Sequence, residues 1–499
     1  MANAPINILL ELRPALNGHA GIPQETRLLF RGLSLLEGVH LEGLLQHSER
    51  LLAPGLPAKS GKWQKPLPMD KQLNRLGLVV ITLEQGSWDS LPSVVANTIG
   101  MAFWHLVGGR EKLTRFEAQH FEDFLWHRFF ARTLPPEDFS IVTRASFRIM
   151  HIPWDAMHIC ALVARAFGFS LFPRLDTSDF DVMISETPYP ATVSPNTKLV
   201  VRYHDAIPLL MPHTISNRRY HQGWHYRALL SNVNSGAWFV CVSEATRKDL
   251  LSIFPQVEAR SLTIHNMVSH HYFEESSDGR LVPEIIRTRL NGNLEPPIDL
   301  GPVRKLLDDY TLAEPMQYLL IVATIEPRKN HLTLLGAWER LRVEQFQKLK
   351  LLVVGTPGWH NKDVIQKFRA WMERGDVFLL RDVPSGELRL LYKHARATVC
   401  PSFGEGFDFA GVEAMKSGGA VVASDIGVHR EVFGDAAEFF NPYSGEDLRQ
   451  AIQKVIDPAH PSRRSELVEK GAVVAQRYAH ETILPQWRAF LNSLLPQNP

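Results

Sequence analysis

Two glutamates, Glu405 and Glu413, have the spacing in this 499-residue chain that most clearly indicates chemistry. They lie in a glycine-containing segment between an apolar strand at 397–400 and a short helix expected over 412–417, which the glycines at 418–419 can cap. In one continuous helix, eight residues would separate the two acids by about 12 Å. A loop that leads into a helix can instead direct both carboxylates at one ligand, while the first helical N–H groups face a phosphate. The segment therefore indicates a nucleotide-sugar site, with one acid for sugar hydroxyls and the other for ribose.

Two adjacent cations, Arg328 and Lys329, form a second candidate group. They follow a predicted strand over 318–324 and precede a predicted helix over 332–341, which Asn330 can cap. Guanidinium and ammonium groups at a strand end, beside a helix N-terminus, suit a diphosphate. In isolation, a solvated Arg-Lys pair would explain the dipeptide better. Together with the two glutamates, the pair favours a clamp for a nucleotide diphosphate.

Short runs of Val, Ile and Leu alternate with helical patterns, which predicts an α/β protein with parallel sheets and helices on both faces. The strands expected in the first half are Ile6–Glu11, Gly77–Thr82, Asp181–Ser185, Leu199–Tyr203 and Trp238–Val242. Those expected in the second half are Tyr318–Thr324, Lys350–Val354, Val377–Arg381, Ala397–Pro401 and Ala420–Ser424. We expect two facing Rossmann-like, doubly wound domains with an interdomain cleft, because ligands of such folds bind at the carboxyl ends of the strands.

The composition of the chain indicates where these domains begin and end. Residues 1–290 are predicted to form an N-terminal domain, and residues 317–478 a C-terminal domain. The connecting residues 291–316 belong to a stretch that is rich in Pro, Gly and charge and lacks a clear strand, which indicates a linker. An amphipathic helix within 479–499 is expected to pack back on the N-terminal domain. The irregular region 51–148 is left unassigned.

The bulk composition is that of a soluble globular protein, with 45% hydrophobic and 21% charged residues and a net charge of +1. This charge gives no electrostatic basis for a nucleic-acid partner. Cys160, Cys241 and Cys400 are too widely spaced for a disulfide framework or a C-x-x-C zinc site, and we expect buried free thiols in a reducing compartment. Charged residues follow the apolar run 6–10 at once, so it is expected to be a strand rather than a secretory signal. The expected location is the cytoplasm, with peripheral association with the inner membrane left open.

The second half of the chain resembles a known family. The segment Val322-Ala-Thr-Ile-Glu-Pro-Arg-Lys-Asn-His331, then Val354-Gly355, then Glu405-x7-Glu413, is similar to the donor domain of retaining glycosyltransferases of family 4. So is the segment 422–437, and the similarity covers roughly residues 317–447. The resemblance implies the GT-B fold, with residues 1–290 as the acceptor-side domain and residues 317–478 as the donor domain. It also implies a nucleotide-diphosphate sugar as donor substrate, no cofactor and no obligatory metal.

The resemblance also implies roles for the acidic and basic residues. Arg328 and Lys329 look like the groups that bind the diphosphate and stabilise the leaving nucleotide. Glu405 resembles the acid that contacts the transferred sugar, and Glu413 the acid that binds ribose. Gly355, after the neighbouring strand, is placed among the donor-binding residues.

The loop between the two glutamates departs from the family pattern. Backbone amides of Gly406, Phe407 and Asp408 are expected to cradle the sugar or the phosphate. The family often has Gly-Phe-Gly-Leu-Pro where this chain has Gly-Phe-Asp408-Phe-Ala410. Aspartate tolerates unusual φ values better than most residues, so the loop can persist, and its carboxylate could alter sugar selection.

The N-terminal half carries fainter matches to the same family. Gly21 lies in the loop after the first strand, where a glycine lets the backbone approach the donor phosphate and the acceptor. His204 follows a predicted strand and is expected to hydrogen-bond the transferred sugar, although a structural histidine is the alternative. Asp205 is expected to orient the sugar or the acceptor. Ser243 is predicted to cap a helix and is assigned no chemistry.

Two further patterns are given structural interpretations. Asp179-Phe-Asp181 matches the D-x-D pattern with which another glycosyltransferase fold holds manganese, but it directly precedes a predicted strand and is interpreted as a strand boundary. His221 and His225 have the spacing of a ligand pair without an evident third ligand, so they are assigned to a surface helix face.

These observations predict a retaining hexosyltransferase. GDP-mannose or a related GDP-sugar is the favoured donor and UDP-glucose the next. The acceptor is expected to be a hydroxyl of a glycan or of a lipid-linked saccharide in bacterial polysaccharide synthesis. Two alternatives stay open: a GT-B nucleotide-sugar epimerase, and a non-catalytic scaffold subunit of a polysaccharide assembly complex.

Overall fold

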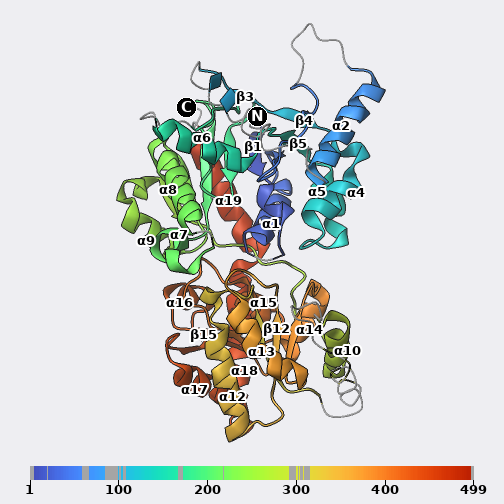
Figure 1. Cartoon of the computed structure of the whole chain (residues 1–499), viewed down its shortest axis with the longest axis vertical. Coiled ribbons are helices and arrows are strands. Elements are labelled where there is room, and N and C mark those ends of the chain that lie inside the picture. Colours follow the sequence, from blue (N-terminus) through green and yellow to red (C-terminus); the bar gives the residue numbers. More distant parts are fainter. Residues whose placement is uncertain are drawn as a thin grey trace.

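The computed structural model contains two α/β domains, one above the other in Figure 1, each built around its own sheet. The structure describes residues 5–19, 21–58, 67–84, 99–100, 103–104, 108–166, 172–216, 218–290, 299, 301, 303, 307 and 315–495. The two facing doubly wound domains expected from the sequence are confirmed.

The N-terminal sheet has the strand order β10-β9-β8-β7-β1-β2-β5-β4, and only the β4–β5 pair is antiparallel. Its strands are β1 (Ile6–Glu11), β2 (Val39–Leu45), β4 (Thr114–Phe116), β5 (Ser146–Ile149), β7 (Val182–Ser185), β8 (Lys198–Tyr203), β9 (Trp238–Cys241) and β10 (Ser261–Thr263). The strand order changes direction between β1 and β7, which makes the loops after these strands the expected ligand edge. A separate small pair joins β3 (Glu111–Lys112) to β6 (Leu175–Asp176).

The C-terminal sheet is parallel throughout, in the order β13-β12-β11-β14-β15-β16. Its strands are β11 (Tyr318–Val322), β12 (Lys350–Val354), β13 (Val377–Leu380), β14 (Ala397–Cys400), β15 (Val421–Ser424) and β16 (Ala437–Phe440). Here the order changes direction between β11 and β14, so the two loops that carry the predicted cations and glutamates leave adjacent strands. Side chains of β12, β13, β14 and β15 are buried along their full length, as expected for a sheet covered on both faces.

Helices cover both sheets (Figure 1). Those of the first part of the chain are α1 (Ile22–Ser34), α2 (Met69–Glu84), α4 (Glu122–Leu125), α5 (Phe139–Thr143), α6 (Trp154–Ala166), α7 (Ile207–Leu210), α8 (Arg218–Asn234), α9 (Glu244–Ile253) and α10 (Val282–Arg289). Those of the second part are α12 (His331–Glu344), α13 (Lys362–Glu373), α14 (Ser385–His394), α15 (Phe409–Lys416), α16 (Gly427–Phe433), α17 (Gly445–Ile456), α18 (Pro461–Ala475) and α19 (His480–Leu494). Within the described residues, no helix combines the length and apolar character needed to cross a membrane.

The predicted strand Gly77–Thr82 is wrong, because this segment lies inside helix α2. Its run of β-branched residues has the composition of a strand. The buried side chains, however, are Leu76, Val79 and Leu83, spaced three and four residues apart as on one face of a helix. Ile81 on the other face is half exposed.

The last helix, α19, returns to the N-terminal domain, where Figure 1 shows it in red beside α1. Phe490 packs edge-on against Trp238 of β9, and the guanidinium of Arg202 lies over the ring of Trp487. α10 instead contacts α14, through an ion pair between Arg289 and Glu387 at 2.7 Å. The domain boundaries at 290 and 317 stay predictions, since most of the predicted linker lies outside the described residues.

Candidate active site

The predicted site residues meet in a cavity of about 480 Å³ between the carboxyl ends of the two sheets. We call it the cleft cavity. All of the predicted site residues except Gly355 line it. These are Gly21, His204, Asp205, Arg328, Lys329, Glu405, Gly406, Phe407, Asp408 and Glu413. The exception, Gly355, lines an adjoining cavity of similar volume that shares Gln24 and Glu413 with the first. Both glutamates therefore reach one cavity, as the loop-to-helix pattern predicts.

Glu405 lies at the centre of a charge cluster. Its Oε1 accepts a hydrogen bond from Lys329 Nζ at 2.5 Å, and its Oε2 accepts one from Arg328 at 2.6 Å. Arg328 also donates to Glu326 Oε1 at 2.7 Å and to the carbonyl oxygen of Gly404 at 2.6 Å. The two predicted diphosphate-binding cations are thus ion-paired with the predicted sugar-binding acid.

The same contacts fix the charges of this cluster. Burial opposes ionisation of Glu405, but the cations of Arg328 and Lys329 hold the pKa of this carboxyl below its usual value. Burial likewise disfavours the charged form of Arg328, and the carboxylates of Glu405 and Glu326 outweigh this effect and raise its pKa. Glu405 and Arg328 are therefore both charged at neutral pH, so an anionic ligand would meet a guanidinium already held in place.

Glu413, on α15, is buried against partners from both domains. Its Oε1 accepts a hydrogen bond from Gln24 Nε2 at 2.7 Å, and its Oε2 accepts one from the hydroxyl of Tyr392 at 3.0 Å. Burial raises the pKa of the Glu413 carboxyl to about 7. The hydrogen bonds from Gln24 and Tyr392 lower it, but by less than burial raises it. Gln24, on α1, was not identified from the sequence, where nothing connects it to a residue so distant in the chain.

His204 faces the cavity from the end of β8 and is paired with a buried acid that the sequence reasoning missed. Its Nε2 lies 3.1 Å from Oε2 of Glu186, the residue that follows β7. Burial, with the nearby Arg202, lowers the pKa of His204 to about 4. Burial also raises the pKa of Glu186 to about 8, and its Oε1 has no hydrogen-bond partner within the described part of the chain. His204 is therefore a neutral imidazole whose orientation is set by Glu186.

Close backbone approaches explain the glycines of the site. A Cβ atom on Gly406 would lie 1.7 Å from the carbonyl oxygen of His204, which belongs to the opposite domain. A Cβ atom on Gly355 would lie 2.0 Å from the carbonyl oxygen of Ala323. Gly21 precedes α1 with φ of 71°, a left-handed conformation that favours glycine.

Two sequence-based interpretations of this region are wrong. Asp408 does not need an unusual φ, since its value is −109°. Its side chain instead accepts a hydrogen bond from the backbone N–H of Gly411 at the start of α15 and lies 3.2 Å from Nε2 of His429. Asn330 does adopt a left-handed φ of 57°, and its side chain makes no capping bond to α12. Its amide donates to the carbonyl oxygens of Pro401 and Pro442. The bond to Pro401 joins the loop that carries Arg328 and Lys329 to the loop that carries Glu405.

The remaining sequence predictions concern capping and strand ends. Asp205 Oδ1 accepts a hydrogen bond from the backbone N–H of Ile207 at 3.0 Å while it lines the cleft cavity. Ser243 caps α9, as predicted. Asp181 directly precedes β7, and its carboxylate accepts a hydrogen bond from the backbone N–H of Asn7, as expected of a strand boundary. His225 lies on α8, as expected, but is only partly exposed and lies near the hydroxyl of Tyr203.

Further contacts hold the domains together around the cleft. The indole N–H of Trp359 donates to the carbonyl oxygen of Thr214 at 2.7 Å. The carboxylate of Glu431 on α16 accepts hydrogen bonds from the backbone N–H groups of Glu244 and Ala245 at the start of α9. The two domains are therefore in direct contact beside the cleft cavity.

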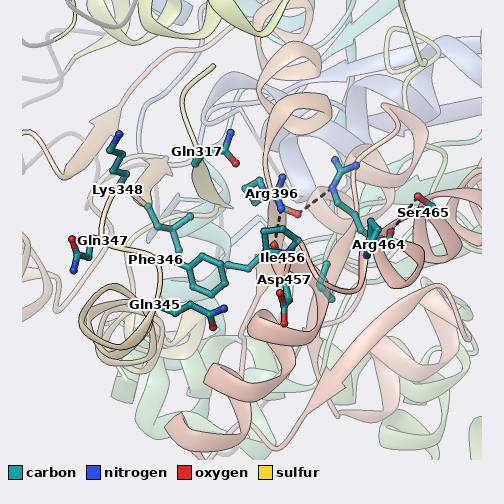
Figure 2. Close-up of a pocket in the computed structure, with 14 residues that line it drawn as sticks. Gln317, Gln345, Phe346, Gln347, Lys348, Arg396, Ile456, Asp457, Arg464 and Ser465 are labelled. Carbon is teal, nitrogen blue, oxygen red and sulfur yellow. Dashed lines mark hydrogen bonds between the residues drawn. The ribbon is translucent and has the colours of Figure 1, made fainter. Parts of the chain in front are cut away.

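A larger cavity, of about 690 Å³, lies on the other side of the C-terminal domain (Figure 2). Gln317, Leu349 and Arg396, which line it, precede strands β11, β12 and β14 and so mark the amino edge of the sheet. Arg396 donates to the carbonyl oxygen of Ile456, and Arg464 to that of Arg396. None of the predicted site residues lines this cavity, so it is separate from the candidate active site.

Comparisons with known proteins agree with this arrangement. Residues 304–472 match the family model described as glycosyl transferases group 1. The chain is 27% identical to O-antigen chain mannosyltransferase B of Escherichia coli over 58% of its own length and 68% of that protein. It is 32% identical to the serotype-specific mannosyltransferase WbdA of Escherichia coli over 28% of its own length, which spans only 18% of that relative.

Solved structures show the same fold. Sucrose-phosphate synthase from Thermosynechococcus elongatus superimposes with a TM-score of 0.58 at 13% identity, over 98% of this chain and 99% of that one. Anabaena HepE in complex with UDP gives a TM-score of 0.50 at 14% identity, over 98% and 100% of the two chains. The protein is a glycosyltransferase of the GT-B fold. It is similar to bacterial mannosyltransferases, and its C-terminal domain matches the group 1 family.

Proposed function

We propose that the protein is a retaining mannosyltransferase of O-antigen or related polysaccharide synthesis, with a GDP-sugar as donor and UDP-glucose as the next candidate. The observation that supports this most is the meeting of Glu405, Lys329 and Arg328 with Glu413 in one cavity opposite His204. The similarity to bacterial mannosyltransferases favours mannose and an acceptor that is a glycan or a lipid-linked saccharide.

The proposed reaction breaks the bond between the sugar and the diphosphate. Arg328 and Lys329, with the N-terminal N–H groups of α15, would stabilise the negative charge on the departing diphosphate. The leaving phosphate oxygen would accept the proton of the acceptor hydroxyl, which attacks from the same face. Glu405 would bind hydroxyls of the transferred sugar and offset the positive charge that develops on its ring.

The other contacts would position the two substrates. Glu413 would accept hydrogen bonds from ribose, and the neutral imidazole of His204 would hydrogen-bond the transferred sugar. Asp205 lines the N-terminal side of the cavity, where the acceptor is expected. A closed cleft would exclude water and so limit hydrolysis of the donor.

Transfer from GDP-mannose to a saccharide acceptor tests this proposal. Glu405→Gln should lower turnover about 100-fold or more while the far-UV circular dichroism stays that of the wild type. The control is Glu469→Gln, which changes an exposed glutamate on α18. Near-normal turnover of the Glu405 variant would refute the assignment of the donor site. Adding magnesium or manganese chloride to the metal-free protein should leave turnover unchanged, and activation by either ion would contradict a metal-independent reaction.

A further inference from the structure

Three groups with metal-binding atoms gather away from the cleft. Glu137 belongs to a turn of 3-10 helix at 136–138, and His270 and His271 belong to the segment that follows β10. One ligand atom from each of the three lies within 4.8 Å of the others. Glu137 Oε1 is 3.0 Å from His271 Nε2, and the centroids of the two imidazole rings are 4.9 Å apart. The three side chains thus face a common point.

A fourth candidate ligand stands beside them. His480, the first residue of α19, has its ring centroid 6.3 Å from that of His270. The two chain segments that carry these histidines are joined nearby, since the N–H of Val268 donates to the carbonyl oxygen of Tyr478 at 2.9 Å. The Nε2 atom of His480 lies 3.2 Å from Oε1 of Glu481, so the ring would have to turn from this carboxylate to become a third imidazole ligand.

The donor set has the composition of a zinc site. Zinc takes imidazole nitrogen and carboxylate oxygen at roughly 2.0–2.2 Å in a tetrahedral arrangement, which puts neighbouring ligand atoms about 3.3 Å apart. The Glu137–His271 separation already fits this spacing. The side chain of Glu137 is 62% exposed, so it can turn toward an ion without disturbing the core.

The position of the cluster gives such an ion a mechanical role. Arg389 on α14 donates to the carbonyl oxygen of His271 at 2.7 Å and pairs with the carboxylate of Glu275 at 2.8 Å. Lys416 on α15 donates to the carbonyl oxygen of Ser269 at 3.1 Å. The backbone that carries the two histidines therefore contacts the C-terminal domain directly, so the cluster lies where the two domains meet.

We propose that Glu137, His270 and His271, with His480 as fourth ligand, bind one divalent transition-metal ion of the zinc type and so join the turn at 136–138 to the segment at 269–271 where the two domains meet. The ion takes no part in the transfer reaction. This site is independent of the function proposed above, because it shares no residue with the cleft cavity.

Titration of the metal-free full-length chain with zinc chloride, followed by calorimetry, tests the site. The wild type should bind one equivalent, and His271→Ala should weaken that binding at least about tenfold. Glu137→Gln provides a second variant at an exposed position, in case the histidine substitution impairs folding. The control is His460→Ala, which removes a 75% exposed histidine 3.5 Å from Asp457 and outside the cluster.

Each outcome decides the proposal. The proposal is supported if the wild type binds zinc one-to-one, both cluster variants bind it more weakly, and the His460 control binds it like the wild type. It is also supported if zinc raises the Tm of the wild type and of the control but not of the cluster variants. Absence of saturable binding by the wild type, or equal affinities in the wild type and the Glu137 variant, would overturn it.

Discussion

The amide nitrogen of Gln24 lies 2.7 Å from Oε1 of Glu413, although 389 positions separate the two residues in the chain. This bond joins α1 of the N-terminal domain to α15 of the C-terminal domain, and both side chains are almost fully buried. It makes the predicted ribose-binding acid a contact between the two domains.

The pH dependence of nucleotide binding follows from this environment. Burial raises the pKa of Glu413 to about 7, so the carboxylate that would accept hydrogen bonds from ribose forms as pH rises through 7. GDP affinity measured by calorimetry should therefore increase between pH 6 and pH 8, and Glu413→Gln should abolish the increase. Gln24→Leu removes a bond that favours the ionised form, so it should move the increase to higher pH. A flat profile in the wild type would contradict the proposed role of Glu413.

Lys329→Ala should weaken the binding of GDP itself, since the ammonium group is expected to contact the diphosphate. A hydrogen bond to a charged group contributes roughly 1.5–3 kcal/mol, which corresponds to about a 10- to 100-fold change in Kd. The matched control is Lys367→Ala, at an exposed position on α13. Unchanged affinity in the Lys329 variant would remove this residue from the proposed clamp.

Gly406→Ala should prevent closure of the domains, because the new Cβ would meet the carbonyl oxygen of His204 at 1.7 Å. We expect loss of transfer activity and an increased radius of gyration in solution scattering. Gly336→Ala serves as control, since a Cβ there has no atom within 4 Å, and within helix α12 it should stabilise the fold by roughly 0.5–1 kcal/mol. An active and compact Gly406 variant would show that this approach is dispensable.

Glu186→Gln should change how stability depends on pH. The pKa of Glu186 is raised to about 8 in the folded protein, above the ordinary value of 4.5, so the folded state binds this proton more tightly than the unfolded state. Its contribution to the free energy of unfolding is therefore fully present below pH 4.5 and is lost between pH 4.5 and about 8, by an amount on the order of 5 kcal/mol. Urea unfolding between pH 6.5 and 8 should show a steeper decline for the wild type than for the variant. Parallel curves would mean that Glu186 is ionised throughout this range.

The same substitution also tests the positioning of His204. Glutamine retains a hydrogen-bonding group beside Nε2 of His204 but cannot ionise. The pH dependence of the transfer rate should therefore change, while the KM for the donor should stay near that of the wild type. The Glu469→Gln variant should match the wild type in both measurements. An unchanged pH profile would leave Glu186 with a structural role only.

Much of the C-terminal domain could be predicted because its signals are local. Strand β12 was predicted from its run of apolar residues. In the N-terminal domain, the cap of α9 by Ser243 was predicted for the same reason, since it depends on a neighbour three residues away. The strand predicted at 77–82 failed because composition alone does not distinguish a buried helix face from a strand. There, packing of Leu76, Val79 and Leu83 on one side decided the structure.

The sequence by itself determined strands β11 to β15 of the C-terminal sheet and the loops that carry Arg328, Lys329, Glu405 and Glu413, because strand periodicity and loop chemistry are properties of short segments. Only the tertiary structure decided that the two cations pair with Glu405 and that Gln24 and Glu186 complete the site. Those contacts join residues far apart in the chain across two sheets and a cleft. Burial in that cleft then sets the pKa values of Glu413 and His204, which no local pattern contains.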